Sequence, residues 1–461
     1  MTSPIATARS GLSTRLSQKT STATITVVQG PLAVALSPKR GSITASQTQQ
    51  FTATVFNDPN NAGVTWQVDG NTNGNSTTGT ISATGLFTPG IQPGLHTITA
   101  TSVTDASASA SVSFAVTDLP GVLMHHNDPG RTGQNLKEYA LTPVNVRSSA
   151  FTQLFSCPVD GYVYAQPLWV PNLTVGAVLR NVLFIATEHD SVYAFDADSP
   201  SCTQLWKRSF LGTGVTTMPW QDTSLGSSSL ATNDVFPEIG ITSTPVIDVA
   251  TNTIYVVAKT KETVGTGCSS GSPCYISRLH AMDLATGAEK FGGPVAISAT
   301  NFSPLRHFNR PGLLLANNTI YIGFGSHGDI TNWQGWLFGY DTATLAQKFV
   351  FSTSDPTSGS GGAALWGGGA GPAADASGNI YVTTGNGSYD GVKNFSESVL
   401  KISPTGTLLD WFTPSNRSTL DANDVDLGSA GMMILPDSVG STAHPHLAMA
   451  TGKIEIGRAH V

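Results

Sequence analysis

The sequence contains little charge, which narrows the range of partners. Aspartate, glutamate, lysine and arginine account for 11% of its 461 residues, whereas roughly 25% is typical of globular proteins. The formal net charge is -7, and the lysines and arginines form no cluster along the chain. Because a protein without a basic patch does not attract phosphate groups, we expect neither nucleic acid nor an anionic membrane surface as a partner.

Long apolar runs are missing as well. No stretch of 18 or more consecutive apolar residues occurs, so no segment of this chain is expected to span a membrane. The first 21 residues carry positive charge but lack the apolar core of a signal peptide. Since other features are typical of secreted proteins, we expect the signal peptide to be missing from this fragment.

Cysteine is scarce, and its spacing argues against several metal centres. The four cysteines form neither a C-x-x-C pair nor a pattern typical of zinc or covalent haem. Cys268 and Cys274 flank a Ser/Gly/Pro loop that could close a small disulfide, leaving Cys157 and Cys202 as partners in one of three possible pairings. The alternative is four unrelated thiols. We favour disulfides, which predict an extracellular, cell-surface or periplasmic location.

Glycine is abundant, and a short β-rich segment recurs. Residues 183–198 are predicted to form a strand, a polar turn and a second strand. The first of these strands returns at intervals of 71, 66, 60 and 66 residues, led by Phe184, Tyr255, Tyr321, Tyr381 and Leu447. Each repeat holds four predicted strands with a Pro-containing segment near the start of most, which is typical of the blades of a β-propeller.

Residues 30–117 are predicted to form a separate β-sandwich. Apolar and polar residues alternate, as at Phe51, Ala53 and Val55, which indicates strands with one buried face. We expect Trp66 to lie in the core. The segments TQQFTATV, VTWQVDG and GTISATGLFTPG resemble the bacterial group 2 immunoglobulin-like domain, which implies a spacer or adhesion module without catalytic residues. Residues 1–29 look like the remnant strand of a preceding domain of the same kind.

The linker and propeller lead-in, residues 118–150, contains the motif MHHNDPGRTGQN. One interpretation is a metal site formed by His125, His126 and Asp128. However, adjacent residues on an extended strand point in opposite directions, so both histidines cannot face one ion. We therefore favour a packing segment in which Arg131 and Asn135 hydrogen-bond neighbouring loops.

The repeats carry a further signature. AMDLATG at residues 281–287 fits an A-x-D-x-x-T-G pattern, and AFD at 194–196 and GYD at 339–341 fit it in part. These repeats, with the HNDPGRTG lead-in, resemble the pyrroloquinoline-quinone-like (quinoprotein-type) β-propeller superfamily. The resemblance implies an all-β chain in which the immunoglobulin-like sandwich precedes an incomplete propeller of four-stranded blades over residues 151–453. Enzymes and non-enzymes share this fold.

The last residues, 454–461, do not continue the repeat. They read IEIGRAHV, and Glu455 to Val461 resemble the in-frame translation of a sequencing-adapter oligonucleotide. We expect an artefactual tail on a truncated gene, with further blades encoded beyond it.

Polar residues gather in the turns at one end of the predicted blades. In a four-stranded meander, the turn after the second strand and the turn entering the next innermost strand lie at the same end, around one mouth of the central channel. The candidates are Glu188, His189, Asp190, Glu238, His307, Arg310, His327, Asp329, Trp366, Asn386 and Asp426. Such groups could bind a cation, a quinone carboxylate or a sugar, and a histidine could act as a general base. The alternative is that they tie loops together through hydrogen bonds.

The leading hypothesis is an extracytoplasmic binding or scaffold protein in which immunoglobulin-like modules display the propeller to a small molecule, a sugar or a surface ligand. The runner-up is a quinoprotein oxidoreductase of alcohols or sugars, which would need pyrroloquinoline quinone and calcium. Alcohol dehydrogenases of the superfamily hold the quinone with adjacent cysteines, and this chain has no adjacent cysteine pair. Trp366 could stack on a quinone and Glu238 and Asn386 could bind calcium, but no motif assigns these roles. The sequence leaves open whether the protein is an enzyme.

Overall fold

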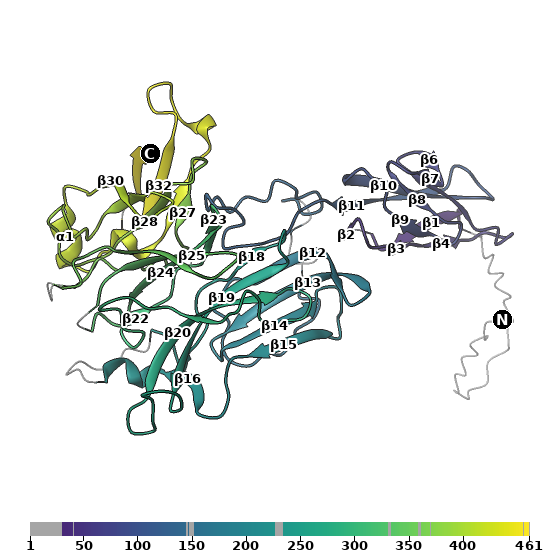
Figure 1. Cartoon of the computed structure of the whole chain (residues 1–461). Coiled ribbons are helices and arrows are strands. Elements are labelled where there is room, and N and C mark those ends of the chain that lie inside the picture. The colour runs from purple at the N-terminus through teal and green to yellow at the C-terminus, as the bar shows by residue number, and fades with distance from the viewer. Residues whose placement is uncertain are drawn as a thin grey trace, which may run out of the picture.

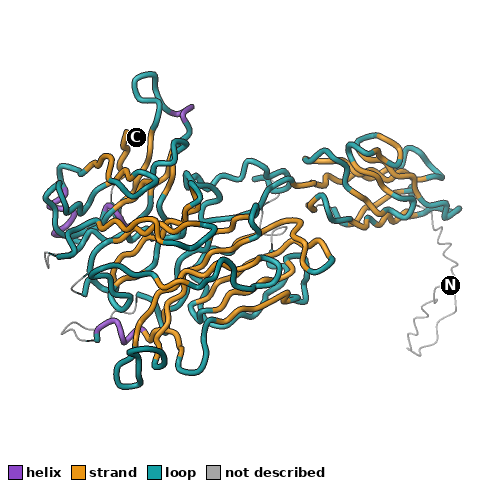
Figure 2. Tube along the Cα trace, in the orientation of Figure 1, coloured by secondary structure: helices purple, strands orange, loops and turns teal. Residues whose placement is uncertain are grey.

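The computed structural model describes residues 30–39, 41–143, 146, 152–225, 234–330, 333–357, 361–368, 370–454 and 456–460. Within these ranges the chain is built from strands, with few and short helices (Figure 2). A β-sandwich at the N-terminal side is followed by a larger body of successive antiparallel sheets, the blades of a β-propeller (Figure 1). The all-β prediction is confirmed. The predicted remnant strand at residues 1–29 lies outside the described residues.

The sandwich consists of eleven strands in three sheets. A five-stranded sheet has the order β2-β11-β10-β5-β6, a four-stranded sheet the order β3-β9-β8-β7, and β1 pairs with β4. The strands are β1 (Ala33–Ser37), β2 (Ser42–Thr44), β3 (Gln49–Gln50), β4 (Thr52–Phe56), β5 (Val64–Val68), β6 (Asn71–Thr72), β7 (Gly74–Asn75), β8 (Gly79–Ile81), β9 (Leu86–Thr88), β10 (Gly94–Ser102) and β11 (Ser109–Thr117).

Aromatic rings fill the core of the sandwich. Phe51, Phe87 and Phe114 are buried, and their rings meet edge to face with centroids 5.2 to 6.4 Å apart. Trp66 is buried beside them, as predicted. Edge-to-face contacts add to the free energy gained by burying the rings, because the positive edge of one ring lies against the negative face of another. The alternation of apolar residues along the strands therefore produces one compact apolar core.

The propeller body is described over five sheets, which we number as blades 1 to 5 in chain order. Blade 1 contains β12 (Leu168–Val175), β13 (Val178–Thr187), β14 (Ser191–Asp196) and β15 (Gln204–Ser209). Blade 2 contains β18 (Val246–Asp248), β19 (Thr253–Glu262), β20 (Cys274–Asp283) and β21 (Val295–Ala296), with β16 (Val215–Pro219) and β17 (Glu238–Ile239) added beside β19. Each blade is thus an antiparallel meander of neighbouring strands.

The remaining blades repeat this order. Blade 3 contains β23 (Leu314–Ala316), β24 (Thr319–Ser326), β25 (Trp336–Asp341) and β26 (Gln347–Ser352), with β22 (His307–Phe308) also pairing with β24. Blade 4 contains β27 (Ala373–Ala374), β28 (Ile380–Thr383), β29 (Val399–Ile402) and β30 (Leu408–Phe412), and blade 5 contains β31 (Met432–Ile434), β32 (Leu447–Thr451) and β33 (Ile456–His460). The short helices are η1 (Trp220–Ser224), α1 (Arg417–Ala422), η2 (Leu427–Ser429) and η3 (Asp437–Val439). Among the described strands, blade 1 and blade 5 do not pair.

The repeat signature builds the same turn in different blades. In blade 2 the Asp283 carboxylate accepts hydrogen bonds from the backbone amides of Ala285 and Thr286 and from the Thr286 hydroxyl. In blade 3 Asp341 binds the amide and hydroxyl of Thr344 in the same way. An aspartate that bonds the backbone two and three residues ahead fixes a tight turn. The Asp-x-x-Thr pattern is therefore a turn signal between the third and fourth strands.

The lead-in segment crosses the inner strands of several blades. Val122 exchanges two backbone hydrogen bonds with Trp169 of blade 1, and Ile247 of blade 2 donates its amide to the carbonyl of Leu123. Further along, the amides of Ala374 in blade 4 and Ile434 in blade 5 donate to the carbonyls of Pro129 and Gly130. The lead-in thus joins blades that are far apart in sequence.

Arg131 completes these connections. Its guanidinium is buried and donates to three backbone carbonyls, those of His125, Leu313 and Pro372, at 2.7, 2.9 and 2.9 Å. Burial lowers the pKa of Arg131 to about 10, which still leaves the side chain charged at neutral pH. The packing interpretation agrees with these contacts for Arg131 but is wrong for Asn135, which is exposed and whose side chain accepts only the amide of Lys137, two residues away, within the described chain. His125 and His126 stack on one another with centroids 4.0 Å apart, so the expectation that adjacent histidines point in opposite directions is wrong. The segment is not an extended strand, because His126 has a positive φ of 56°.

Both predicted disulfides are present, Cys157–Cys202 and Cys268–Cys274. Helices of the described chain are too short and too polar to cross a membrane. The last strand, β33, pairs antiparallel with β32 over the region predicted to be an artefactual tail. That prediction concerns the origin of the residues, so it stays a prediction.

Candidate functional site

The turn that follows β13 places Glu188, His189 and Asp190 in different surroundings. Glu188 and Asp190 are buried, whereas the His189 side chain is 43% exposed. Asp190 has a positive φ of 47°, a conformation that aspartate tolerates better than most residues. Gly240 packs against this turn, and a Cβ there would lie 2.2 Å from the Glu188 carbonyl oxygen. The turn thus sends one imidazole outward and two carboxyl groups inward.

His189 and Glu238 form a hydrogen-bonded pair at the surface. His189 Nδ1 lies 3.0 Å from Glu238 Oε2 and 3.1 Å from Oε1. The Thr217 hydroxyl donates to Glu238 Oε2 at 2.8 Å, so both carboxylate oxygens have partners. Beside this pair, the carbonyl of Tyr162 accepts the Glu188 amide at 2.9 Å. We call Tyr162, Tyr164, His189, Phe236 and Glu238 the loop face.

A cluster of ionisable side chains lies beneath the loop face. We define the axial cluster as Glu188, Asp190, Lys259 and His327, all buried. Lys259 Nζ donates to the carbonyl oxygen of His307 at 2.7 Å and to His327 Nε2 at 2.8 Å. Because a lysine ammonium can only donate, His327 Nε2 must be the acceptor, which makes this imidazole neutral.

Burial dominates the protonation of the axial cluster. It raises the pKa of Glu188 to about 7 and lowers the pKa of Lys259 to about 7. Burial, followed by the charge of Glu188, raises the pKa of Asp190 well above its ordinary value. Burial, followed by the neighbouring Lys259 charge, holds the pKa of His327 well below its ordinary range. For each of the four groups burial is the largest cause, and it favours the neutral form.

His307 is held in place by hydrogen bonds within the protein. Its Nδ1 donates to the Ser303 carbonyl at 2.9 Å, and its Nε2 accepts from Trp336 Nε1 at 3.0 Å. Burial lowers the pKa of His307 to about 4. With both ring nitrogens used, the imidazole supports the packing of blade 3 and does not face a cavity.

A second polar cluster, formed by Asp329, Asn386, Glu397 and Asp426, lies between blades 3, 4 and 5. Asp426 Oδ1 accepts the backbone amide of Asn386 at 2.9 Å, and its Oδ2 lies 2.9 Å from Lys453 Nζ. Glu397 Oε2 accepts a backbone amide, and burial raises the pKa of Glu397 to about 7. Asp329 accepts from the Ser326 hydroxyl, and burial raises its pKa. This cluster ties loops to one another.

Two predicted site residues lie apart from the axial cluster. Trp366 is half-buried beside Trp333, with ring centroids 6.1 Å apart, and its Nε1 has no hydrogen-bond partner among the described residues. A Cβ at Gly385 would lie 2.6 Å from that same nitrogen, so the indole is packed against backbone. Arg310 is exposed, with its guanidinium beside Gly368.

The structure therefore brings part of the predicted set together. The axial cluster contains three predicted residues around Lys259, namely Glu188, Asp190 and His327, and the pair of His189 and Glu238 lies above it. The second polar cluster contains three more, namely Asp329, Asn386 and Asp426. Sequence reasoning missed Lys259 and Glu397. Lys259 lies in the apolar run IYVVAKTKE, where a charged residue at a position predicted to be buried was a usable signal.

The residues present do not fit the quinone and calcium of the runner-up hypothesis. The described part of the chain contains no group of three or more His, Cys, Asp or Glu side chains able to hold a metal ion. Glu238 is engaged by His189 and Thr217, and the cysteines form two disulfides in separate loops. Trp366, the candidate stacking residue, packs against Gly385. We therefore derive no step through these groups.

Comparisons with known proteins concern the fold. No family model and no curated protein matches the chain. Among solved structures, a europium-containing methanol dehydrogenase gives a TM-score of 0.49 at 14% identity, covering 73% of this chain and 55% of that one. The quinohemoprotein alcohol dehydrogenases of Pseudomonas putida HK5 and Comamonas testosteroni give TM-scores of 0.47 and 0.45 at 16% identity, covering 73% and 72% of this chain and 45% and 46% of theirs. The chain thus spans about half the length of these structures.

Proposed function

We propose that the protein is an extracytoplasmic binding protein whose propeller presents the loop face to a protein partner. The observation that carries this proposal is the exposure of aromatic rings around the hydrogen-bonded pair of His189 and Glu238. Tyr162, Tyr164 and Phe236 are 55%, 51% and 50% exposed, and the His189–Glu238 pair lies among the same loops. Exposed aromatic residues around polar groups are typical of binding surfaces.

The loop face is rigidly supported. The Tyr162 and Tyr164 rings lie 6.5 Å apart at an angle of 57°. The loop before them is fixed by Asp160, which accepts the hydroxyl groups of Thr187 and Ser191 at 2.9 and 2.8 Å. Rings that are already positioned lose little conformational entropy when a partner binds, which favours affinity.

The buried groups support a binding role over a catalytic one. A general base must reach the proton it removes, but His307 and His327 are buried and Lys259 is hydrogen-bonded within the protein. The turn beneath the loop face is fixed by Glu188 Oε2, which accepts the Gly240 amide at 2.8 Å and the Thr242 hydroxyl at 3.1 Å. The two disulfides agree with an oxidising location outside the cytoplasm.

Site-specific photocrosslinking tests this proposal. A photoreactive residue at position 164 should capture a discrete partner from the secreted or surface fraction, and the double variant Tyr162→Ala/His189→Ala carrying the same residue should lose it. A probe at Ile91, which is 85% exposed on the sandwich, is the matched control. Capture of the same proteins from both positions, or capture that survives the double variant, would refute the proposal.

A second assay addresses catalysis directly. The full chain is supplied with pyrroloquinoline quinone and calcium and tested for dye-linked oxidation of alcohols and sugars. We expect no turnover above that of the cofactor alone. Turnover that is lost in the variant Glu238→Gln would replace the binding proposal with the oxidoreductase hypothesis.

A further inference from the structure

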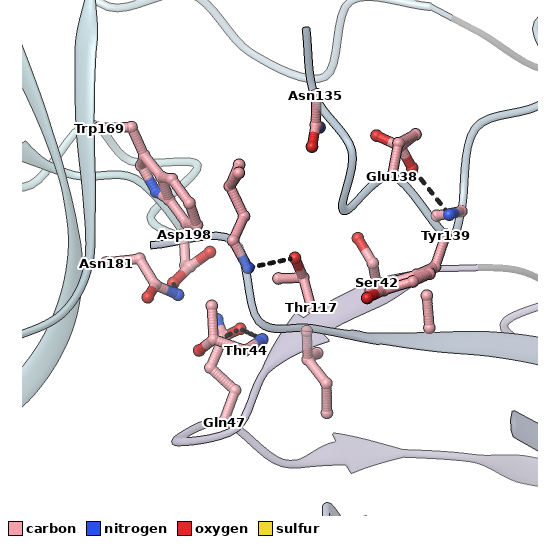
Figure 3. Close-up of a pocket in the computed structure, with 14 residues that line it drawn as sticks. Ser42, Thr44, Gln47, Thr117, Asn135, Glu138, Tyr139, Trp169, Asn181 and Asp198 are labelled. Carbon is pink, nitrogen blue, oxygen red and sulfur yellow. Dashed lines mark hydrogen bonds between the residues drawn. The ribbon is translucent and has the colours of Figure 1, made fainter. Parts of the chain in front are cut away.

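The junction between the sandwich and blade 1 contains a polar cavity of about 230 Å³, which we call the junction cavity (Figure 3). Its lining comes from three parts of the chain. Ser42, Thr44 and Gln47 come from the sandwich, Asn135 and Glu138 from the lead-in, and Trp169 and Asp198 from blade 1. In Figure 3 the blade residues lie on one side, with the sandwich residues and the lead-in residues around the remaining sides.

Hydrogen bonds at the border of the junction cavity connect the parts of the chain that line it. The Ser46 hydroxyl donates to Asn172 Oδ1, which joins the sandwich directly to blade 1. Lys137 Nζ and the Tyr139 hydroxyl donate to the two oxygens of Asp118 at 2.8 and 3.1 Å. These contacts position the lead-in against the end of β11. The sandwich, the lead-in and blade 1 are therefore connected by hydrogen bonds at the border of the cavity.

Several polar atoms of the lining have no hydrogen-bond partner within the described chain, and three of the side chains that carry them, Asn135, Glu138 and Asp198, are exposed to solvent. The described residues provide no hydrogen bond to Trp169 Nε1, to the side-chain amide nitrogens of Gln47 and Asn135, or to Glu138 Oε2 and Asp198 Oδ1, whereas the other oxygens of the two carboxylates accept hydrogen bonds. Three donors and two acceptors thus surround one space. A ligand that both donates and accepts hydrogen bonds would satisfy them.

The charge of the lining residues restricts the class of ligand further. Two carboxylates line the cavity and no lysine, arginine or histidine does, so anions such as phosphate or sulfate are disfavoured. A metal ion is not expected, since the described residues include no suitable group of ligands. The volume is below the roughly 300 to 1,000 Å³ of pockets for drug-sized molecules. A small neutral molecule remains.

We propose that the junction cavity binds a neutral monosaccharide. The Trp169 indole offers an apolar face for the C–H groups of a sugar ring and an N–H donor for a hydroxyl, and the free amides and carboxylate oxygens match the remaining hydroxyls. Because the lining includes both the sandwich and blade 1, the bound sugar would bridge the two and stiffen their junction. This site is separate from the loop face.

The test is a titration of the full chain with glucose, galactose, mannose and N-acetylglucosamine, followed by calorimetry or ligand-detected NMR. We expect saturable binding of at least one sugar and no binding of glucuronate or inorganic sulfate. Trp169→Ala should weaken binding by about tenfold or more, and Trp169→Phe should retain most of it. Absence of binding by all four sugars, or equal binding by Trp169→Ala, would overturn the proposal.

A conservative variant separates a local effect from misfolding. Glu138 Oε1 accepts two backbone amides at 2.7 Å, and Glu138→Gln retains this oxygen while replacing the free Oε2 with a donor. We expect weaker sugar binding with an unchanged melting temperature, and unchanged affinity would count against the site. The Tyr162→Ala/His189→Ala variant should bind the sugar normally, so the two proposals can fail independently.

Discussion

The sandwich and the propeller bury different kinds of side chain in their interiors. The sandwich core is a set of phenylalanine rings with Trp66 and aliphatic side chains, and its buried His96 is paired with Asp69 at the border, 2.7 Å away. The propeller encloses charged side chains, with Arg131 bound to three carbonyls and Lys259 among carboxyl groups. Both regions are built mainly from antiparallel strands, with one parallel pairing between β2 and β11 in the sandwich, so strand direction does not explain this difference.

The comparison shows where each kind of interior is needed. Two facing sheets meet along continuous side-chain surfaces, which apolar residues fill well. Blades around an axis bring several strand ends and turns together, and their backbone carbonyls need donors once they are buried. Arg131 and Lys259 supply these donors at positions where no neighbouring strand can. Their loss should therefore act differently from the loss of an apolar ring.

Arg131→Ala should have the largest effect. It leaves three buried carbonyls without a donor and removes a large buried side chain. We expect a loss of about 5 kcal/mol in the free energy of unfolding of the propeller, measured by urea denaturation. The unfolding transition of the sandwich should not move. If both transitions shift equally, the two regions unfold as one unit and the comparison fails.

Phe114→Ala should have the reverse pattern. Its ring contacts Phe51 and Phe87 edge to face inside the sandwich. Removing a buried ring of this size costs about 4 kcal/mol, and the loss should appear in the sandwich transition alone in a calorimetric scan. Phe114→Leu, which fills part of the space, serves as the milder control and should lose less than half as much. A loss below about 1 kcal/mol would contradict the packing described.

Lys259→Met tests the buried cation. Methionine preserves the length and apolar stem of the side chain but leaves the His307 carbonyl and His327 Nε2 without their donor. We expect a loss of roughly 3 kcal/mol in the propeller transition, because both acceptors are buried and would lose their donor. The exposed Lys137 offers a control, because its ion pair with Asp118 lies at the surface and Lys137→Met should leave the free energy of unfolding nearly unchanged. An unchanged stability of Lys259→Met would show that the donor is dispensable.

Glu188→Gln should produce the smallest effect, visible as pH dependence. The pKa of Glu188 is raised from 4.5 to about 7 by burial, so between these values the folded state binds more protons than the unfolded state. The free energy of unfolding of the propeller should therefore fall as the pH rises from 5 to 7, and Glu188→Gln should remove roughly 2 kcal/mol of that fall. Denaturation at pH 5 and pH 7 measures the difference, and an identical slope in the variant would show that Glu188 does not titrate as described.

Much of the fold could be predicted because it depends on periodic burial. The alternation at Phe51, Ala53 and Val55 and the recurring strands led by Tyr255 and Tyr321 mark buried faces directly. The aspartate turns were visible as a short motif. Strand pairing that joins distant segments was not, such as the addition of β17 to β16 in blade 2, because two-residue strands carry too little pattern.

The candidate site was predictable in position and less so in chemistry. The positions of the predicted turns put Glu188, His189 and His327 at the same end of the blades. The solvent exposure of each side chain, however, could not be predicted from the sequence. His189 and Glu188 are neighbours in the chain, yet one is half-exposed and the other buried. The role of Lys259 depends on hydrogen bonds to residues 48 and 68 positions away, which no local pattern contains.

The lead-in has a consequence for biosynthesis. It leaves the ribosome before any blade, yet its Arg131 side chain bonds a carbonyl 241 residues later in the chain. Early blades can fold against the lead-in while later blades are still being translated. The contacts between the lead-in and the later blades form last, because joining residues so far apart in the sequence has a large loop-closure entropy cost. The segment is thus synthesised before the blades that pack around it, and moving it to the C-terminus by circular permutation would reverse the order of assembly.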